Sequence, residues 1–265
     1  MIYWILYLAT GAFAGVLAGL LGVGGGIVIV PLLTFVFTAQ GLAEGYILHM
    51  ALGTSLASIM FTSISSFRAH HARGAVDWAV VRTITLGIMT GTFLGSWVAA
   101  QFSSRFLAGF FVVFTYTVAT QMLFNARPKP SRTLPGRGGM FGVGNLIGGV
   151  SSWVGIGGGS LSVPFLAWCN VPIHRAVGTS AAIGFPIAVA GTFGYLLNGL
   201  GVPGLPNETI GFIHLPALFG IALASVCTAP LGARLAHSLP VARLKKFFAV
   251  FLIIMGTRLL LTLVW

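Results

Sequence analysis

A glycine-rich phrase occurs twice in this chain, each time inside an apolar stretch. The first copy, LGVGGGIVIVP, covers residues 21–31, and the second, VGIGGGSLSVP, covers residues 154–164. Each copy places three consecutive glycines just before a short apolar run that contains a proline. Glycine and proline both interrupt regular helices, so these stretches predict broken helices. Paired broken helices in the two halves of an apolar chain are typical of the substrate site of a membrane transporter.

The composition is that of a polytopic membrane protein. Of the 265 residues, 57% are hydrophobic and only 6% are charged, and the mean hydropathy is +0.99. Globular chains carry about 25% charged residues, so these charges are too few to cover a soluble surface. Several apolar stretches reach the roughly 20 residues that a helix needs to cross the hydrocarbon core. We therefore expect an all-α integral membrane protein of a bacterial inner (plasma) membrane.

The strongly basic balance does not indicate nucleic-acid binding. The net charge is +11, from 14 Lys and Arg against Glu44, Asp77 and Glu208. The basic residues stand mostly in short loops between apolar segments, as the positive-inside rule requires of cytoplasmic loops. Neither Cys169 nor Cys227 has a CxxC partner or a nearby His pair, so we expect no metal and no cofactor. The expected partners are the lipid bilayer and a small anionic substrate.

The second half of the chain repeats motifs of the first half in the same order. The matched pairs are HMALGTSLA (49–57) with HRAVGTSAA (174–182), Leu94-Gly95 with Leu231-Gly232, and FFVVF (110–114) with FFAVF (247–251). Ordered matches of this kind predict a duplicated architecture. We expect a first membrane repeat at 1–125 and a second at 139–265. The proline- and arginine-rich stretch 126–138 is the expected cytoplasmic linker between them.

Hydropathy divides each repeat into five segments. They are expected at about 3–21, 27–39, 47–66, 79–99 and 106–124, and at about 139–156, 160–169, 174–198, 211–236 and 244–264. The segments after the glycine triplets are too short to span a bilayer as helices. We expect them to be half-helices that are either re-entrant or part of a broken span.

Loop charges predict that the two repeats have inverted topology. The linker, the loop carrying Arg68 and Arg73, and the loop from Arg234 to Lys246 are expected in the cytoplasm. The loops around Glu44 and Glu208 contain no Lys or Arg, which suits the opposite side. An odd number of segments per repeat then inverts the second copy and places both termini outside. Arg105 is an exception to the charge rule.

The glycine triplets and the two GTS motifs are the candidate anion site. A half-helix that begins at a glycine triplet presents backbone N–H groups and a positive dipole end to an anion. Hydroxyl groups hold an oxyanion without the strong grip of buried arginines, which favours release. The candidate substrate-binding residues are Gly24, Gly25, Gly26, Thr54, Ser55, Gly157, Gly158, Gly159, Thr179 and Ser180.

Packing is the alternative role for these small residues. It is favoured for Gly11, Gly15 and Gly19, whose spacing suits close helix contact, and it is as plausible as substrate binding for the GTS motifs. His49 and His174 are expected near membrane interfaces, with a gating or proton role left open. Arg82, Arg234 and Arg258 are expected to snorkel from segment ends. No acidic residue falls within an apolar segment, so no carboxylate proton relay is expected.

The doubled GxGGG phrase ending in proline, with a GTS helix after each copy, resembles the TauE/SafE family of sulfite and organosulfonate exporters. The resemblance covers nearly the whole chain. It implies membrane transport of a small sulfur-containing or organic anion such as sulfite or sulfoacetate. We expect the anion to be held between the two half-helix starts and to be moved across the membrane by alternating access.

Three other functions are weighed against export. The first is an uptake permease for a small anion, coupled to protons or Na⁺. The second is an intramembrane enzyme, because Ser160 follows a glycine triplet and His174 is close in sequence, although no base is placed beside the serine. The third is a scaffold or assembly factor, which predicts glycine triplets packed tightly against helices. We assign no catalytic residue.

Overall fold

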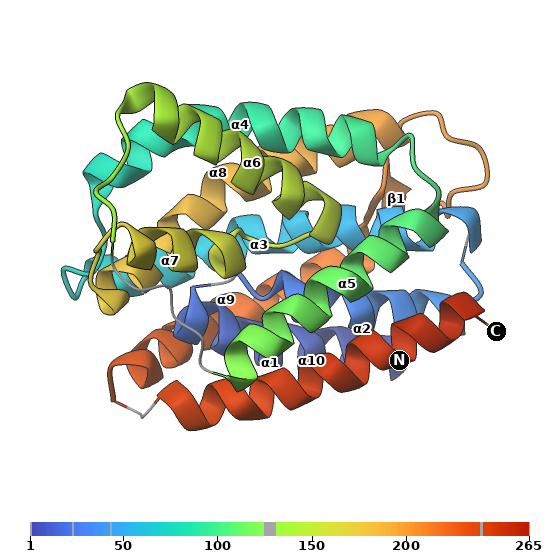
Figure 1. Ribbon diagram of the computed structural model, residues 1–265. Helices are drawn as coiled ribbons and strands as arrows, with labels where there is room; N and C mark the ends of the chain where they lie inside the picture. The colour runs from blue at the N-terminus through green and yellow to red at the C-terminus, as the bar shows by residue number, and fades with distance from the viewer. Residues whose placement is uncertain (1, 23, 43, 125–130, 239–240, 265) are drawn as a thin grey trace.

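The computed structural model describes residues 2–22, 24–42, 44–124, 131–238 and 241–264, and these residues form a bundle of ten α-helices (Figure 1). The first five are α1 (Ile2–Leu21), α2 (Gly26–Ala39), α3 (Ile47–His71), α4 (Trp78–Ala99) and α5 (Ser104–Leu123). The second five are α6 (Arg137–Val154), α7 (Gly159–Trp168), α8 (Ile173–Gly199), α9 (Leu215–Ser238) and α10 (Val241–Val264). A 3₁₀ turn covers Glu44–Tyr46, and a two-stranded hairpin joins β1 (Thr209–Ile210) to β2 (Ile213–His214).

The all-α membrane fold is confirmed. Among the described residues, six helices are long and apolar enough to cross a bilayer, namely α1, α3, α4, α5, α8 and α9. The two segments that follow the glycine triplets, α2 and α7, are the short ones. The chain is an integral, polytopic membrane protein.

Three predicted boundaries differ from the structure. Helix α3 continues to His71, so Arg68 lies on a helix and only Arg73 lies in the following turn. Helix α9 begins at Leu215 rather than near 211, because Thr209 and His214 pair across the short hairpin. Helix α6 begins at Arg137, inside the predicted linker, whose residues 125–130 lie outside the described part of the chain.

The helices pack in a pattern that stays the same when the two halves are exchanged. The closest pairs are α1 with α9, α4 with α6, α3 with α8, α4 with α8, α5 with α10, and α3 with α9. The first helix of one half corresponds to the first of the other, and so on, from α1 with α6 to α5 with α10. Replacing each helix by its counterpart turns the pair α1–α9 into α6–α4 and the pair α3–α9 into α8–α4, and it leaves the pairs α3–α8 and α5–α10 unchanged. The first helix of each half therefore packs on the fourth helix of the other half, and the two halves interlock.

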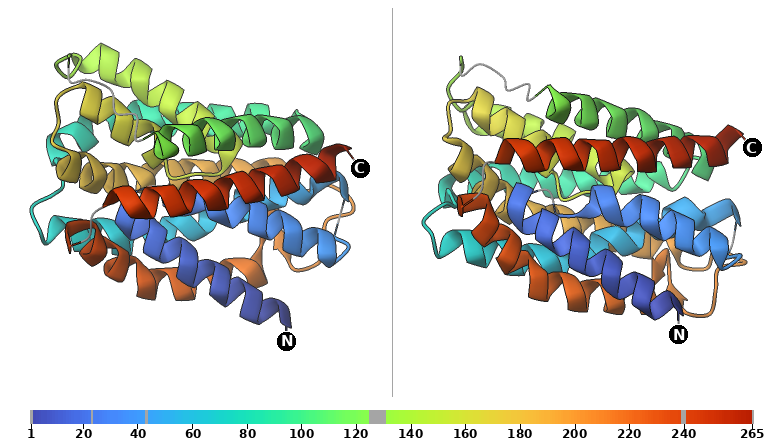
Figure 2. Two further views of the ribbon diagram at one scale, coloured as in Figure 1. Left: turned by 60° about the horizontal axis from the view of Figure 1, so that its bottom comes forward. Right: turned by 90° about the horizontal axis from the view of Figure 1, so that it is seen from below.

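The two halves run in opposite directions through the bundle. Both termini lie at one end, and the end of α5 and the start of α6 lie at the other (Figures 1 and 2). The α3–α4 and α7–α8 connections, the end of α9 and the start of α10 share that second end. It carries Arg73 and Arg175 and is called the basic end below. Since α1 starts at one end and α6 at the other, the inverted topology predicted from loop charge is confirmed.

Small residues allow the first helix of each half to approach its partner closely. A Cβ atom on Gly11, Gly15 or Gly19 of α1 would overlap the backbone of α9. Gly144 and Gly148 of α6 meet the backbone of α4 in the same way. The packing role predicted for the α1 glycines is confirmed.

Candidate functional site

The glycine phrases form sharp turns that start the two short helices. Gly25 has φ 80° and Gly158 has φ 73°, and each stands immediately before the first residue of α2 or α7. Both values lie in the left-handed region, which glycine enters without a Cβ clash. Helices of 14 and 10 residues are about 21 and 15 Å long at 1.5 Å per residue. Either is shorter than the roughly 30 Å hydrocarbon core, as expected of half-helices.

The two phrases, far apart in sequence, touch each other inside the bundle. A Cβ on Gly26 would overlap the carbonyl oxygen of Gly155, and one on Gly24 would lie 3.1 Å from the Cα of Gly157. All six triplet glycines are buried. The structure therefore brings the predicted glycines together, backbone against backbone. This contact between the two glycine phrases is called the glycine crossing below, and it is closed in this structure. Such packing is the arrangement expected of a scaffold, and equally of a transporter whose path is shut in this conformation.

The serines of the GTS motifs fasten each central helix to the opposite glycine phrase. The Ser55 hydroxyl on α3 donates to the carbonyl oxygen of Gly155 at 2.7 Å. The Ser180 hydroxyl on α8 donates to the carbonyl oxygen of Gly22 at 3.2 Å. Both serines are fully buried. In this conformation these hydroxyls bind protein rather than facing an open site, which is the packing role.

The threonines of the same motifs bind the opposite half at a second place. Thr54 Oγ1 accepts a hydrogen bond from the backbone N–H of His214, and Thr179 Oγ1 accepts one from Asp77, each at 2.9 Å. Asp77 and His214 cap the starts of α4 and α9. The GTS motifs thus join the central helices to the long helices of the other half, in two copies.

Two buried hydroxyls near the start of α7 have no hydrogen-bond partner. Ser151 Oγ is fully buried and Ser160 is 8% exposed. Ser151 Oγ lies 3.5 Å from the position of a Cβ on Gly158, the residue that caps α7. Leaving such a group unsatisfied costs about 1–3 kcal/mol, and a ligand that accepts the hydrogen bond is one explanation for an unpartnered hydroxyl.

This serine pair occurs in only one of the two halves. The glycine phrases align Ser151 with Ala18 and Ser160 with Ile27, both of which are buried and apolar. Ser160 was considered above only as a nucleophile, and Ser151 was not singled out. The signal that finds them is a polar residue in one repeat where the other repeat is apolar.

Helix α3 also carries a row of buried hydroxyls, of which its counterpart α8 keeps only the first. The row leads from the glycine crossing toward the basic end and consists of Ser55, Ser58, Thr62 and Ser66. The aligned positions on α8 are Ser180, Ile183, Ile187 and Gly191. Thr62 Oγ1 lies 2.5 Å from Ser225 Oγ on α9. Buried hydroxyls therefore follow one face of α3 toward the basic end, and α8 has apolar residues or glycine at the last three aligned positions.

The two histidines singled out from the sequence lie at helix starts. His49 is buried near the start of α3, with its ring nitrogens 3.2 Å from Ser104 Oγ and 3.3 Å from the Ala99 carbonyl. These contacts tie α3 to the α4–α5 connection. His174 is exposed in the first turn of α8. The Ser160 hydroxyl has no hydrogen-bond partner. Neither histidine therefore binds it, and no nucleophile–base pair is present there.

A third histidine, not singled out from the sequence, stands at the hairpin before α9. His214 is 2% exposed, and its Nδ1 accepts the backbone N–H of Ala217. The carboxylate of Glu208 lies 3.6 Å from its Nε2. Burial lowers the pKa of His214 below its ordinary value, and Glu208 opposes that shift. The neutral ring is therefore the form that the folded protein favours.

Acidification is expected to destabilise the protein through His214. Because the folded pKa lies below the unfolded value of 6.5, the unfolded chain binds the proton more readily, and stability is lost as the pH falls through that value. Protonation also removes the lone pair that caps α9. We expect the thermal midpoint to drop between about pH 7.5 and about pH 5. His214→Asn, which keeps an acceptor at the cap, should flatten that drop. An unchanged pH profile in the variant would contradict this role.

Comparison with known proteins identifies the family to which this arrangement belongs. The family model of the sulfite exporter TauE/SafE matches residues 7–259. The chain belongs to the TauE/SafE family. Among curated relatives, a probable membrane transporter protein of Haemophilus influenzae is 38% identical over 259 residues, covering 97% of this chain and 98% of that protein.

More distant relatives carry the same description. A probable membrane transporter protein of Methanocaldococcus jannaschii is 29% identical over 273 residues, covering 97% of this chain and 95% of that protein. One of Bacillus subtilis is 29% identical over 216 residues, covering 74% of this chain and 79% of that protein. No solved structure matches the chain. This TauE/SafE member is a membrane transporter, and the names of its family and relatives indicate transport rather than an enzyme activity.

Proposed function

We propose that this transporter exports a small sulfur-containing or organic anion, such as sulfite or sulfoacetate, across a bacterial inner membrane. The observation that carries the proposal is the meeting of two half-helix starts beside buried hydroxyls without partners. The predicted glycines, Gly24 to Gly26 and Gly157 to Gly159, form the meeting point. Ser151 and Ser160 supply the free hydroxyls next to it.

The chemistry of this region favours an anionic guest. The N-terminus of α7 carries the positive end of a helix dipole, and a serine hydroxyl donates readily to an oxyanion. The three carboxylates of the chain stand outside the long helices: Glu44 in the 3₁₀ turn, Asp77 as the cap of α4 and Glu208 before the hairpin. No acidic side chain in a spanning helix is therefore available to repel an anion or relay protons.

Transport requires the closed glycine crossing to open toward each side in turn. The GTS serines hold the crossing shut by binding the carbonyl oxygens of Gly155 and Gly22. Each bond joins the two halves, with its donor serine in one half and its acceptor carbonyl in the other. Release of one bond with retention of the other would therefore open the crossing asymmetrically. This gives Ser55, Ser180 and their threonine neighbours a gating role beside their packing role, and it suits alternating access by inverted repeats.

The membrane potential favours export of an anion. An inside-negative potential drives each negative charge outward with about 2.3 kcal/mol per 100 mV, so exit needs no coupled ion. Uptake of the same anion would have to be coupled to protons or Na⁺. The lack of an acidic relay among the spanning helices supports uncoupled exit over uptake.

Flux in proteoliposomes tests the proposal. Purified full-length protein is reconstituted and loaded with sulfite or sulfoacetate, and a K⁺ gradient with valinomycin sets the potential. We expect anion flux toward the positive side that reverses when the potential is reversed and needs no proton or Na⁺ gradient. Flux that appears only with such a gradient would support the uptake permease instead. The absence of both flux and binding for these anions would overturn the proposal.

A further inference from the structure

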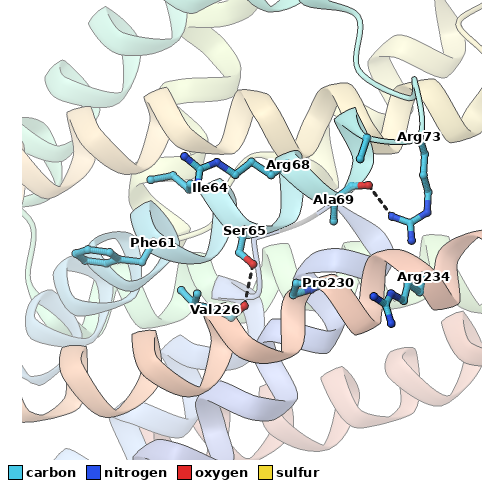
Figure 3. Close-up of a pocket in the computed structure, with 10 residues that line it drawn as sticks. Phe61, Ile64, Ser65, Arg68, Ala69, Arg73, Val226, Pro230 and Arg234 are labelled. Atoms are coloured by element: carbon cyan, nitrogen blue, oxygen red, sulfur yellow. Dashed lines mark hydrogen bonds between the residues drawn. The ribbon is translucent and has the colours of Figure 1, made fainter.

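A groove opens between α3 and α9 at the basic end of the bundle, away from the glycine crossing. Its volume is about 720 Å³. Figure 3 shows the last turns of α3 on one side and of α9 on the other. The Ser65 hydroxyl on α3 donates to the Val226 carbonyl on α9 at 2.8 Å and so joins the two walls.

The inner part of the groove is apolar and open to the surroundings of the bundle. Phe61 and Ile64 line it from α3, and Val226 and Pro230 line it from α9. Phe61 is 43% exposed and Val226 is 37% exposed. Both lie within membrane-spanning helices, and an apolar lining of this kind suits an acyl chain better than water. A ligand that lies along it must itself be largely apolar.

Arginines line the outer part of the same groove. Arg68, Arg73 and Arg234 are all exposed. Figure 3 shows Arg73 and Arg234 toward the same end of the groove, whereas the Arg68 side chain runs back along α3 toward Ile64. The Arg73 guanidinium donates one hydrogen bond to the Ala69 carbonyl. A guanidinium has five N–H donors in all. None of the described residues that line the groove is acidic.

The arginines are not a requirement of the duplicated scaffold. The aligned positions in the other half are Phe193 for Arg68, Asn198 for Arg73 and Trp97 for Arg234. Phe193 is 59% exposed and Trp97 is 56% exposed. The equivalent surface therefore carries two aromatic residues and an asparagine where this groove carries arginines, although both halves use the same helix packing.

We propose that this groove binds an anionic phospholipid, with its phosphate at Arg73 and Arg234, with Arg68 adding positive charge from α3, and with an acyl chain along Phe61, Ile64 and Val226. Guanidinium groups bind phosphate oxygens with matching geometry. Basic pockets between helices on the cytoplasmic side of a membrane suit anionic headgroups. The apolar inner wall favours a lipid over the small transported anion, which has no chain to cover it. The bound lipid braces α3 against α9, and it does so independently of the export proposal.

Native mass spectrometry of the full-length protein tests the lipid site. The protein is released from micelles containing equimolar phosphatidylglycerol and phosphatidylcholine. We expect wild type to retain phosphatidylglycerol with at least about a tenfold preference, and the triple variant R68Q/R73Q/R234Q to lose that preference. The matched control R82Q/R137Q/R175Q removes the same charge from exposed positions in or near the other basic-end connections and should keep it.

Two further arms make each outcome decisive. R68K/R73K/R234K retains the charge and should retain most of the preference, which also covers the case in which the glutamine variant fails to fold. Equal loss in the groove variant and the matched control would overturn the site in favour of general surface charge. Displacement of phosphatidylglycerol by inorganic phosphate or sulfite at equal concentration would overturn the lipid in favour of a free anion. Flux measured in pure phosphatidylcholine vesicles tests export separately.

Discussion

Alanine at Gly26 is expected to abolish stable, transport-competent protein. The added Cβ would overlap the Gly155 carbonyl oxygen and lie 2.8 Å from the Cα of Ile156. Both obstacles are backbone atoms, which cannot rotate away as a flexible side chain does. Overpacking of this kind costs typically about 1–3 kcal/mol and more when backbone must move. Gly26 does not have a positive φ, so the effect is steric contact between the two phrases and not conformational strain.

Gly109→Ala is the matched control. Gly109 lies within α5, and a Cβ there meets nothing within 4 Å. Alanine in a helix interior is favoured over glycine by about 0.5–1 kcal/mol, so this variant should be at least as stable as wild type. Denaturation in detergent and the yield of monodisperse protein compare the two variants. Wild-type stability and flux in Gly26→Ala would show that the phrases do not touch in the native protein.

Ser160→Ala is expected to reduce anion affinity while leaving stability unchanged or raised. Its hydroxyl is buried without a partner, so its removal relieves a desolvation cost rather than breaking a bond. When an anion is bound, the same hydroxyl donates to a charged acceptor, which contributes about 1.5–3 kcal/mol. Loss of that bond corresponds to roughly 10- to 100-fold weaker binding. Ser151→Ala should behave in the same way. Flux titrations and thermal denaturation of the same preparations measure both quantities.

Ser162→Ala distinguishes a ligand contact from a structural one. The Ser162 hydroxyl lies 2.7 Å from Ser180 Oγ and donates to the Gly158 carbonyl at 2.8 Å. Its removal should lower stability, because it breaks buried hydrogen bonds, one of which joins α7 to α8. If Ser160→Ala instead lost stability and kept full flux, the anion site would have to lie elsewhere.

Much of the fold was predictable because it depends on local properties of the chain. Segment lengths follow from the apolar runs, and a glycine triplet before Pro31 or Pro164 shortens the helix wherever it occurs. The α1 glycines predicted close packing because the absence of a Cβ acts the same way in any neighbourhood. The inverted relation followed from loop charge together with an odd number of segments.

The boundaries that were missed depend on contacts at a distance. Arg68 and Arg73 were both expected in a loop, yet α3 holds one of them, because the helix packs against α9 as far as its last turns. The hairpin before α9 depends on the pairing of Thr209 with His214. Hydropathy cannot predict this pairing, because the hydropathy of a residue is the same in a loop and in a strand.

By itself, the sequence determined the membrane class, the duplicated order of segments and the glycines that break two of them. Only the tertiary structure decided that the two phrases touch and that the GTS hydroxyls bind the opposite half. It also left Ser151 and Ser160 without partners and placed three arginines around one groove. The physical reason is the distance along the chain over which each property acts. Hydrophobicity and backbone freedom belong to each residue, whereas hydrogen-bond satisfaction and steric contact depend on which distant backbone arrives beside it.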